Sequence, residues 1–279
     1  MRDSAGAFAA ALTCVLAATG RAQSTAADTA SPRDARDARH AVSKRPEFGR
    51  NTRVMLSSAA GAGLAVSLFD SRLVAGTERW EDRRGLGRTS AIGNFVGGPV
   101  PITVGVALYA TGRAVHHPFT ANLGREVIRA VLVSGGLTAV AKGIVGRARP
   151  FASPGDADEF DPGGGFTNSA LTSFPSGHTS AAFATATVVA RELNAKHPRG
   201  RRFINPLLFG GATLVGFGRI YGRQHWPSDV VVGAAVGAIT GYEVVAHARG
   251  DRSRIRVGLL SHLSLRPNRE GIALGWALR

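Results

Sequence analysis

Three clusters of basic, histidine and small polar residues have the composition needed to bind and cleave a phosphate ester. The first is Lys142 followed, after six residues, by Arg149-Pro150, and the second is Pro175-Ser176-Gly177-His178. The third runs from Arg219 to Asp229 and contains His225. Arginine offers a planar fork that matches two phosphate oxygens, and lysine offers a compact point charge. Lys142, Arg149 and Arg219 are therefore the expected phosphate-binding cations.

The Ser-Gly-His turn is expected to add donors that carry no net charge. Ser176 can offer its hydroxyl, and Gly177 and His178 can offer backbone N–H groups at the start of a helix. The helix dipole favours an anion at this position. Glycine also allows a substrate to approach the backbone closely. Ser176 and Gly177 are thus predicted to bind phosphate together with the three cations.

The two histidines suit two different roles. A nucleophilic histidine needs one unprotonated ring nitrogen, and a carboxylate near the other nitrogen fixes the tautomer and stabilises positive charge. Asp229 lies four residues after His225 and can provide that carboxylate. His178 is then the general acid for the leaving oxygen and the base that activates water. This chemistry requires no metal and no cofactor.

Each of these residues also has an ordinary explanation when it is taken alone. Ser176 or Asp229 could simply cap a helix, a histidine before a tryptophan could belong to the core, and an arginine is usually solvated. The net charge of +15 is explained first by a preference for arginine codons and second by attraction to anionic lipid or substrate. Lys142, however, is one of only three lysines among 34 basic residues. The presence of all three clusters in one chain therefore favours a catalytic site over the separate structural explanations.

The segments that must position these clusters are predicted to be helices. Six apolar segments rich in Ala, Gly, Val and Leu are too long for typical strands. They predict an all-α fold, a bundle of about six helices, with segments Val54–Phe69, Thr89–Gly112, Val127–Val145, Thr179–Leu193, Leu207–Gly218 and Val230–His247. Alternating apolar residues near the C-terminus predict a short β-hairpin. The acidic loop Phe151–Phe174 lacks the spacing of a calcium-binding EF-hand and is expected to influence substrate choice.

The chain divides into four predicted regions. Residues 1–22 are typical of a secretory signal peptide, with an uncleaved anchor as the alternative. Residues 23–50 are expected to form a flexible linker, 51–247 the helical phosphatase domain, and 248–279 a tail with the hairpin. The single cysteine, Cys14, falls in the signal segment, so no disulfide or thiolate chemistry is expected in the mature protein.

The three clusters resemble the signature motifs of the type 2 phosphatidic acid phosphatase and vanadium haloperoxidase superfamily. Those motifs are Lys, six residues, Arg-Pro; then Pro-Ser-Gly-His; then Ser-Arg, five residues, His, three residues, Asp. Here Gly218 stands where the family usually has serine. By motif the resemblance covers Val127–His247. It implies a helical fold like that of the acid phosphatases and haloperoxidases, with His225 as nucleophile, His178 as acid and Asp229 as the partner of His225.

The resemblance implies a phosphorylated substrate, with a lipid phosphate such as phosphatidic acid or undecaprenyl pyrophosphate favoured. No nucleic-acid partner is expected. Three alternatives stay open: a vanadium-dependent haloperoxidase, a soluble periplasmic non-specific acid phosphatase, and a helical envelope protein without activity.

Two patterns bear on the membrane and point in different directions. A span needs roughly 20 apolar residues, but the uncharged run Val54–Phe69 has 16, and Ala130–Ala141 and Val230–Tyr242 are shorter still. With a mean hydropathy of only +0.03, this favours a soluble periplasmic protein or short, tightly packed spans. With six spans and the N-terminus inside, the cytoplasmic loops would carry more than twice as many basic residues as the outer loops, and the site would lie outside. A cleaved signal would reverse that orientation. The prediction is a cell-envelope protein with its site facing the periplasm, the inner membrane being favoured.

Overall fold

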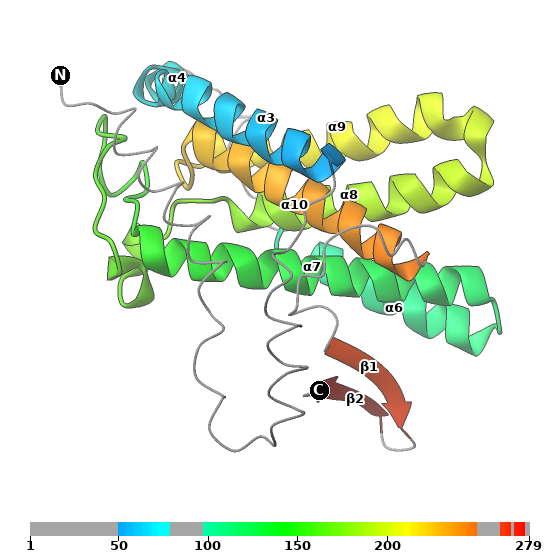
Figure 1. Ribbon diagram of the computed structural model, residues 1–279. Coiled ribbons are helices and arrows are strands. Elements are labelled where there is room, and N and C mark those ends of the chain that lie inside the picture. The colour runs from blue at the N-terminus through cyan, green and yellow to red at the C-terminus, as the bar shows by residue number, and fades with distance from the viewer. Residues whose placement is uncertain (1–49, 79–96, 250–262, 269–270, 277–279) are drawn as a thin grey trace, which may run out of the picture.

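The computed structural model describes residues 50–78, 97–249, 263–268 and 271–276 (Figure 1). Within these ranges it contains seven α-helices and one two-stranded sheet. The helices are α3 (Arg50–Ser67), α4 (Asp70–Glu78), α6 (Val100–Ala114), α7 (Pro118–Val145), α8 (Gly177–Lys196), α9 (Arg201–Tyr221) and α10 (Pro227–Ala248). Strand β1 (Leu263–Asn268) pairs antiparallel with β2 (Gly271–Trp276), and Leu265 lies opposite Leu274. The predicted signal segment lies outside the described residues.

The described part of the chain is helical, as expected, but the expected number of six helices is too low. The segment expected as one helix over Val54–Phe69 ends at Ser67, and α4 follows from Asp70 at an angle of 63°. Helix α7 also begins nine residues before the expected start at Val127. The reason is local: His117 accepts a hydrogen bond from the Thr120 backbone N–H, and Pro118 occupies the first helical turn, where its missing N–H costs nothing.

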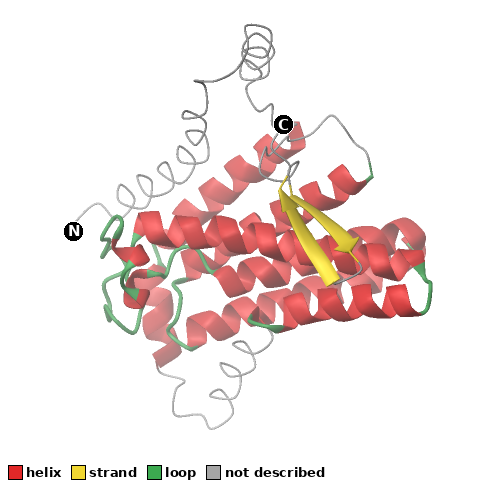
Figure 2. Cartoon of the chain, turned by 90° about the horizontal axis from the view of Figure 1, so that it is seen from below, coloured by secondary structure: helices red, strands yellow, loops and turns green. Residues whose placement is uncertain are grey.

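The core of the bundle lies between α7, α8 and α10. Its fully or nearly fully buried members are Leu123, Val127, Ala130, Ala184, Val188, Val244 and Val245. Helix α10 also packs against α3 and α9. The long connection between α7 and α8, which contains the short 3-10 helices η1 (Gly164–Phe166) and η2 (Ser169–Leu171), gathers at one end of the bundle (Figure 2). The functional residues predicted from the sequence lie at that same end.

Glycines set the close approach of α8 and α10. A Cβ atom at Gly237 would lie 2.1 Å from the Ser180 carbonyl oxygen, and one at Gly233 would lie 2.4 Å from that of Ser176. Both contacts are with backbone, which cannot move without shifting the helix. These glycines therefore hold α10 against the first turns of α8, where the predicted Ser-Gly-His turn begins.

The packing predicts opposite results for two glycine substitutions. Gly237→Ala should destabilise the protein by about 1–3 kcal/mol, because the added methyl overpacks the α8–α10 interface. Gly210→Ala on α9 is the matched control, because nothing lies within 4 Å of its Cβ position. It should be neutral or stabilise by up to about 1 kcal/mol through helix propensity. Thermal unfolding of both variants checks this, and an equal change in Tm would contradict the packing.

Three described helical segments are long and apolar enough to cross a membrane: Pro118–Val145 with 28 residues, Pro198–Tyr221 with 24 and Pro227–Ala248 with 22. The bent pair Val54–Ser67 and Asp70–Thr77 would make a fourth if it formed one span. The uncharged runs in the sequence underestimated these lengths because each helix continues past its run into residues that include charges. Helix length is thus no obstacle to a membrane location.

Candidate active site

Four helix ends and one extended segment bring the predicted site residues together. Helix α7 ends in Gly146, whose left-handed conformation (φ 59°) turns the chain away from the helix. The Arg-x-Arg-Pro segment that follows is extended: Arg147 forms a β-bridge with Phe160, and the Arg149 N–H donates to the Ala170 carbonyl. The start of α8 is tied to the start of α10 by the Ser176 N–H, which donates to the Asp229 carbonyl at 3.0 Å.

His225 lies at the centre of this arrangement and is 1% exposed. Its Nδ1 is 2.6 Å from the carbonyl oxygen of Ser173. A carbonyl can only accept, so Nδ1 must carry the ring proton. In the neutral ring, Nε2 then holds a free lone pair. The backbone at Ser173 thereby selects the tautomer that a phosphoryl transfer to Nε2 requires.

The protonation state of His225 agrees with this tautomer. Burial lowers the pKa of His225 to about 3, although the neighbouring Asp229 carboxylate acts in the opposite direction. The positive charges of Lys142 and Arg219 lower the pKa further. At neutral pH the ring is therefore uncharged, and the Nε2 lone pair is available.

Asp229 reaches His225 less directly than the sequence suggested. Its Oδ2 lies 3.9 Å from His225 Nδ1, which is too long for a hydrogen bond. Oδ2 instead accepts hydrogen bonds from the Ser173 hydroxyl at 2.5 Å and the Trp226 backbone N–H at 2.9 Å. Asp229 was expected to accept the Nδ1–H of His225, but the Ser173 carbonyl accepts it instead. The Asp229 carboxylate acts on His225 through its charge and through its hydrogen bond with Ser173.

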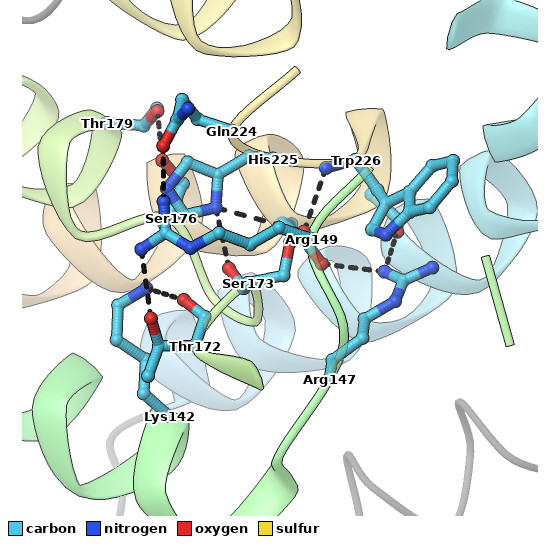
Figure 3. Close-up of polar contacts among 12 residues, drawn as sticks. Lys142, Arg147, Arg149, Thr172, Ser173, Ser176, Thr179, Gln224, His225 and Trp226 are labelled. Atoms are coloured by element: carbon cyan, nitrogen blue, oxygen red, sulfur yellow. Dashed lines mark hydrogen bonds and ion pairs between the residues drawn. The ribbon is translucent and has the colours of Figure 1, made fainter. Parts of the chain in front are cut away.

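Two of the predicted cations, Lys142 and Arg149, lie beside His225 (Figure 3), and the charge of the third, Arg219, acts on both His225 and His178. Lys142 Nζ donates to the Thr172 carbonyl at 2.5 Å, and Arg149 donates to Gln224 Oε1 at 2.6 Å and to Thr172 Oγ1 at 2.9 Å. These acceptors are neutral, so they orient the cations without cancelling their charge. Arg219 is 4% exposed, and its Nε has no hydrogen-bond partner among the described residues. Figure 3 shows the Lys142 ammonium, the Arg149 guanidinium and the His225 ring pointing toward one another.

The start of α8 faces these cations. Ser176 precedes the helix, and its hydroxyl lies 2.9 Å from that of Thr179 rather than on a backbone N–H. The first N–H groups of a helix have no partner within it, so those of Gly177 and His178 can serve an anion. A Cβ atom at Gly177 would lie 3.7 Å from Lys142 Cε. The turn and the lysine are therefore neighbours, as the predicted phosphate site requires.

His178 lies in the field of all three cations. Burial, followed by the charges of Arg219, Lys142 and Arg149, lowers the pKa of His178 to about 4. A bound dianion would offset these charges and raise that pKa toward its usual value near 6.5. His178 is thus neutral beside the three cations, and a bound dianion favours the protonated form that a general acid needs.

This coupling predicts that anion binding takes up a proton. Sulfate is the suitable probe because it does not titrate in the relevant range. Calorimetry at pH 5–6 in buffers with different ionisation enthalpies should show partial proton uptake when sulfate binds to the wild type. The variant His178→Asn should bind sulfate without that uptake, and His197→Asn, which changes an exposed histidine, should behave like the wild type. Equal uptake in all three proteins would contradict the coupling.

Several residues of the site were not predicted from the sequence. Arg147 is 1% exposed and binds Asp229 Oδ1 at 2.6 Å, and Ser173 links Asp229 to His225. Thr172 and Gln224 hold Lys142 and Arg149. The only sequence feature that could have indicated these residues is their closeness to the motifs. Arg147 is two residues before Arg149, Ser173 is two residues before Pro175, and Gln224 is directly before His225.

The chain is similar to known proteins over part of its length. A family model described as PAP2 superfamily matches residues 124–252. A stretch of 72 residues is 40% identical to lipid A 1-phosphatase of Porphyromonas gingivalis; it covers 26% of this chain and only 15% of that protein. The crystal structure of a transmembrane PAP2 type phosphatidylglycerolphosphate phosphatase from Bacillus subtilis matches 67% of this chain and 96% of its own, with 18% identity and a TM-score of 0.33.

Proposed function

Since this chain belongs to the PAP2 superfamily, we propose that it is a phosphatase that cleaves a phosphate ester or diphosphate through a phosphohistidine on His225. The observation that carries the proposal is the free Nε2 lone pair of a buried, neutral His225 beside three cations and a helix start. Such preorganised donors stabilise the charge that develops on a phosphoryl group in transfer.

In the first step, Nε2 of His225 forms a bond to phosphorus. The bond from phosphorus to the leaving oxygen breaks, and its electron pair stays on that oxygen. Protonated His178 donates its proton to the same oxygen, so the leaving group departs as a neutral hydroxyl. Lys142, Arg149 and Arg219 hold the nonbridging oxygens, and the nearby Asp229 carboxylate balances the positive charge of the phosphorylated ring.

In the second step, water cleaves the phosphohistidine. Neutral His178 accepts a proton from water while the water oxygen attacks phosphorus. The phosphorus–nitrogen bond breaks, and its electron pair returns to Nε2 of His225. Inorganic phosphate leaves, and His178 is again protonated for the next cycle. His178 thus gives one proton to the leaving group and takes one from water, so the cycle returns both histidines to their starting states.

A lipid phosphate is the favoured substrate. The relative from Porphyromonas gingivalis is named as a phosphatase of lipid A, which is a lipid. Helix α9, which carries Arg219 in its last turn, exposes Phe203, Leu207 and Leu214 by more than two-thirds each. Exposed apolar side chains on spans of sufficient length fit a bilayer. The site at the ends of these helices would then lie where a lipid head group is presented.

The orientation follows from charge. Helix α8 begins at the site and ends near Lys196, Arg199, Arg201 and Arg202, at the far end of the bundle. Cytoplasmic loops carry an excess of such residues. The proposed location is therefore the inner membrane with the site facing the periplasm.

The test is an activity panel on the purified full chain. Wild-type protein should hydrolyse p-nitrophenyl phosphate and, more efficiently, a lipid phosphate in mixed micelles, and vanadate should inhibit both. A higher kcat/KM for soluble esters than for every lipid phosphate would overturn the lipid assignment. Halide oxidation after vanadate loading, without phosphatase activity, would instead indicate a haloperoxidase.

A further inference from the structure

A buried ionic network lies behind the proposed nucleophile, on the side away from the phosphate-binding cations. Its centre is the Arg147 guanidinium, which binds Asp229 Oδ1 at 2.6 Å and Asp70 Oδ2 at 2.8 Å. All three side chains are at most 1% exposed. The guanidinium also donates to the Ala157 carbonyl and lies 5.4 and 5.5 Å from the Phe160 and Trp226 rings. It is thus held on every side.

Asp70 comes from a distant part of the chain. It is the first residue of α4, and it lies 159 positions before Asp229 and upstream of the region 124–252 that matches the family. Its Oδ1 accepts the Ser228 backbone N–H at 2.9 Å, and its Oδ2 accepts the Ser228 hydroxyl. The Ser228 hydroxyl in turn accepts from Arg147 at 2.8 Å. Asp70 therefore fixes the first turn of α10, immediately beside Asp229.

The network continues to His225 through one residue. Asp229 Oδ2 accepts the Ser173 hydroxyl, and the Ser173 carbonyl accepts Nδ1–H of His225. The Ser173 N–H donates to the Arg147 carbonyl at 3.0 Å, which closes a ring of contacts. Arg147 therefore fixes the position of Ser173 in two ways: its side chain holds Asp229, which binds the Ser173 hydroxyl, and its backbone carbonyl binds the Ser173 N–H. The position of Ser173 in turn sets the tautomer of His225.

The charge of the network also matters. The Asp70 and Asp229 carboxylates share the Arg147 guanidinium, and the Asp229 carboxylate also lies 3.9 Å from Nδ1 of His225. His225 is uncharged before reaction and becomes cationic when it is phosphorylated on Nε2. The Asp229 carboxylate therefore favours the phosphorylated ring over the free ring. Its effect belongs to the chemical step and has little reason to alter substrate binding.

We propose that Asp70 and Arg147 are positioning residues for His225, which orient it through Asp229 and Ser173 and hold the Asp229 carboxylate where its negative charge stabilises the phosphorylated ring. The proposal rests on the proposed function, since it assigns these residues a part in phosphohistidine formation. They do not touch the substrate, and their influence passes through the contacts described above.

The sharpest test is Asp70→Asn. The variant keeps the shape of the side chain and leaves Arg147 paired with Asp229, so the fold should persist, but it removes the ion pair between Arg147 and α4. We expect kcat to fall by about 10- to 100-fold, with KM changed less than about threefold and phosphoenzyme formation slowed equally. Arg72→Gln, an exposed change on the same helix, is the matched control and should retain wild-type kcat.

A second variant tests the proposal if Asp70→Asn fails to fold. Ser228→Ala removes the hydroxyl between Asp70 and Arg147 but no charge, so it should lower kcat by a smaller factor than Asp70→Asn. A purely structural role would lower the Tm of both variants and leave kcat per folded molecule unchanged. That result, or a wild-type kcat in well-folded Asp70→Asn, would overturn the proposal.

One readout does not depend on turnover. The ¹⁵N resonances of His225 report which ring nitrogen carries the proton. In the wild type they should show the Nδ1–H tautomer, and in Asp70→Asn a mixture of tautomers. An unchanged tautomer together with an unchanged kcat contradicts the positioning role. Absence of phosphatase activity in the wild type would instead count against the proposed function, whatever the tautomer shows.

Discussion

Replacing His225 with asparagine is expected to reduce phosphatase activity by about 10,000-fold or more, since the loss of a covalent nucleophile is among the largest single effects in enzymes. Asparagine approximates the size of the imidazole and can still donate to the Ser173 carbonyl, but it offers no lone pair for phosphorus. The measurement is kcat/KM on p-nitrophenyl phosphate and on a lipid phosphate, with equal amounts of folded protein.

Two controls make this result specific. His225→Asn should still bind sulfate, because the three cations and the start of α8 are untouched. His197→Asn, which changes an exposed histidine, should retain full activity. If the His225 variant lost less than about tenfold in kcat/KM, His225 would be a supporting donor and a different residue would have to attack phosphorus.

Replacing Arg147 with methionine is expected to have the largest effect on stability. The change leaves Asp70 and Asp229 buried beside each other without their shared cation, and removal of one partner from a buried ion pair typically costs about 3–5 kcal/mol. The fully buried position prevents water from replacing the lost charge. The free energy of unfolding, measured in the same detergent or buffer as the wild type, checks this.

The matched control changes an exposed arginine in the same way. Arg72→Met on α4 should alter the free energy of unfolding by less than about 0.5 kcal/mol. The double variant Asp70→Asn with Arg147→Met should recover part of the loss, because only one buried carboxylate then remains unpaired. If Arg147→Met were as stable as the wild type, the ionic network would not be formed as described.

Much of the fold could be predicted because the apolar segments are long and their ends carry clear signals. The motif clusters fall at helix ends in the structure, as their sequence context suggested. The extra helix α4 is not predicted because a charged residue directly after an apolar run, such as Asp70, is typical of the end of a helix, whereas here it starts a new one. The early start of α7 was missed because the His117 cap is an uncommon one.

The residues that hold His225 in place were harder to predict from the sequence than the residues that face the phosphate. Residues that face a phosphate must be of particular types at particular spacings, so Lys142, Arg149, Arg219 and His178 were visible in the sequence. The acceptor for His225 is a backbone carbonyl, and any residue type at position 173 would provide one. Asp70 is 77 residues from Arg147, and only the packing of α4 on the site brings them together.

The most direct test of the central claim is to trap the intermediate on the enzyme. Wild-type protein, mixed with ³²P-labelled substrate and quenched within milliseconds in base, should carry a label that is stable to alkali and lost in acid, as a phosphorus–nitrogen bond is. Mass spectrometry should place it on the peptide that contains His225, and with p-nitrophenyl phosphate, whose leaving group needs little protonation, His178→Asn should retain more label because water attack is slowed. An unlabelled enzyme under turnover, or a label on any other residue, would contradict a phosphohistidine at His225.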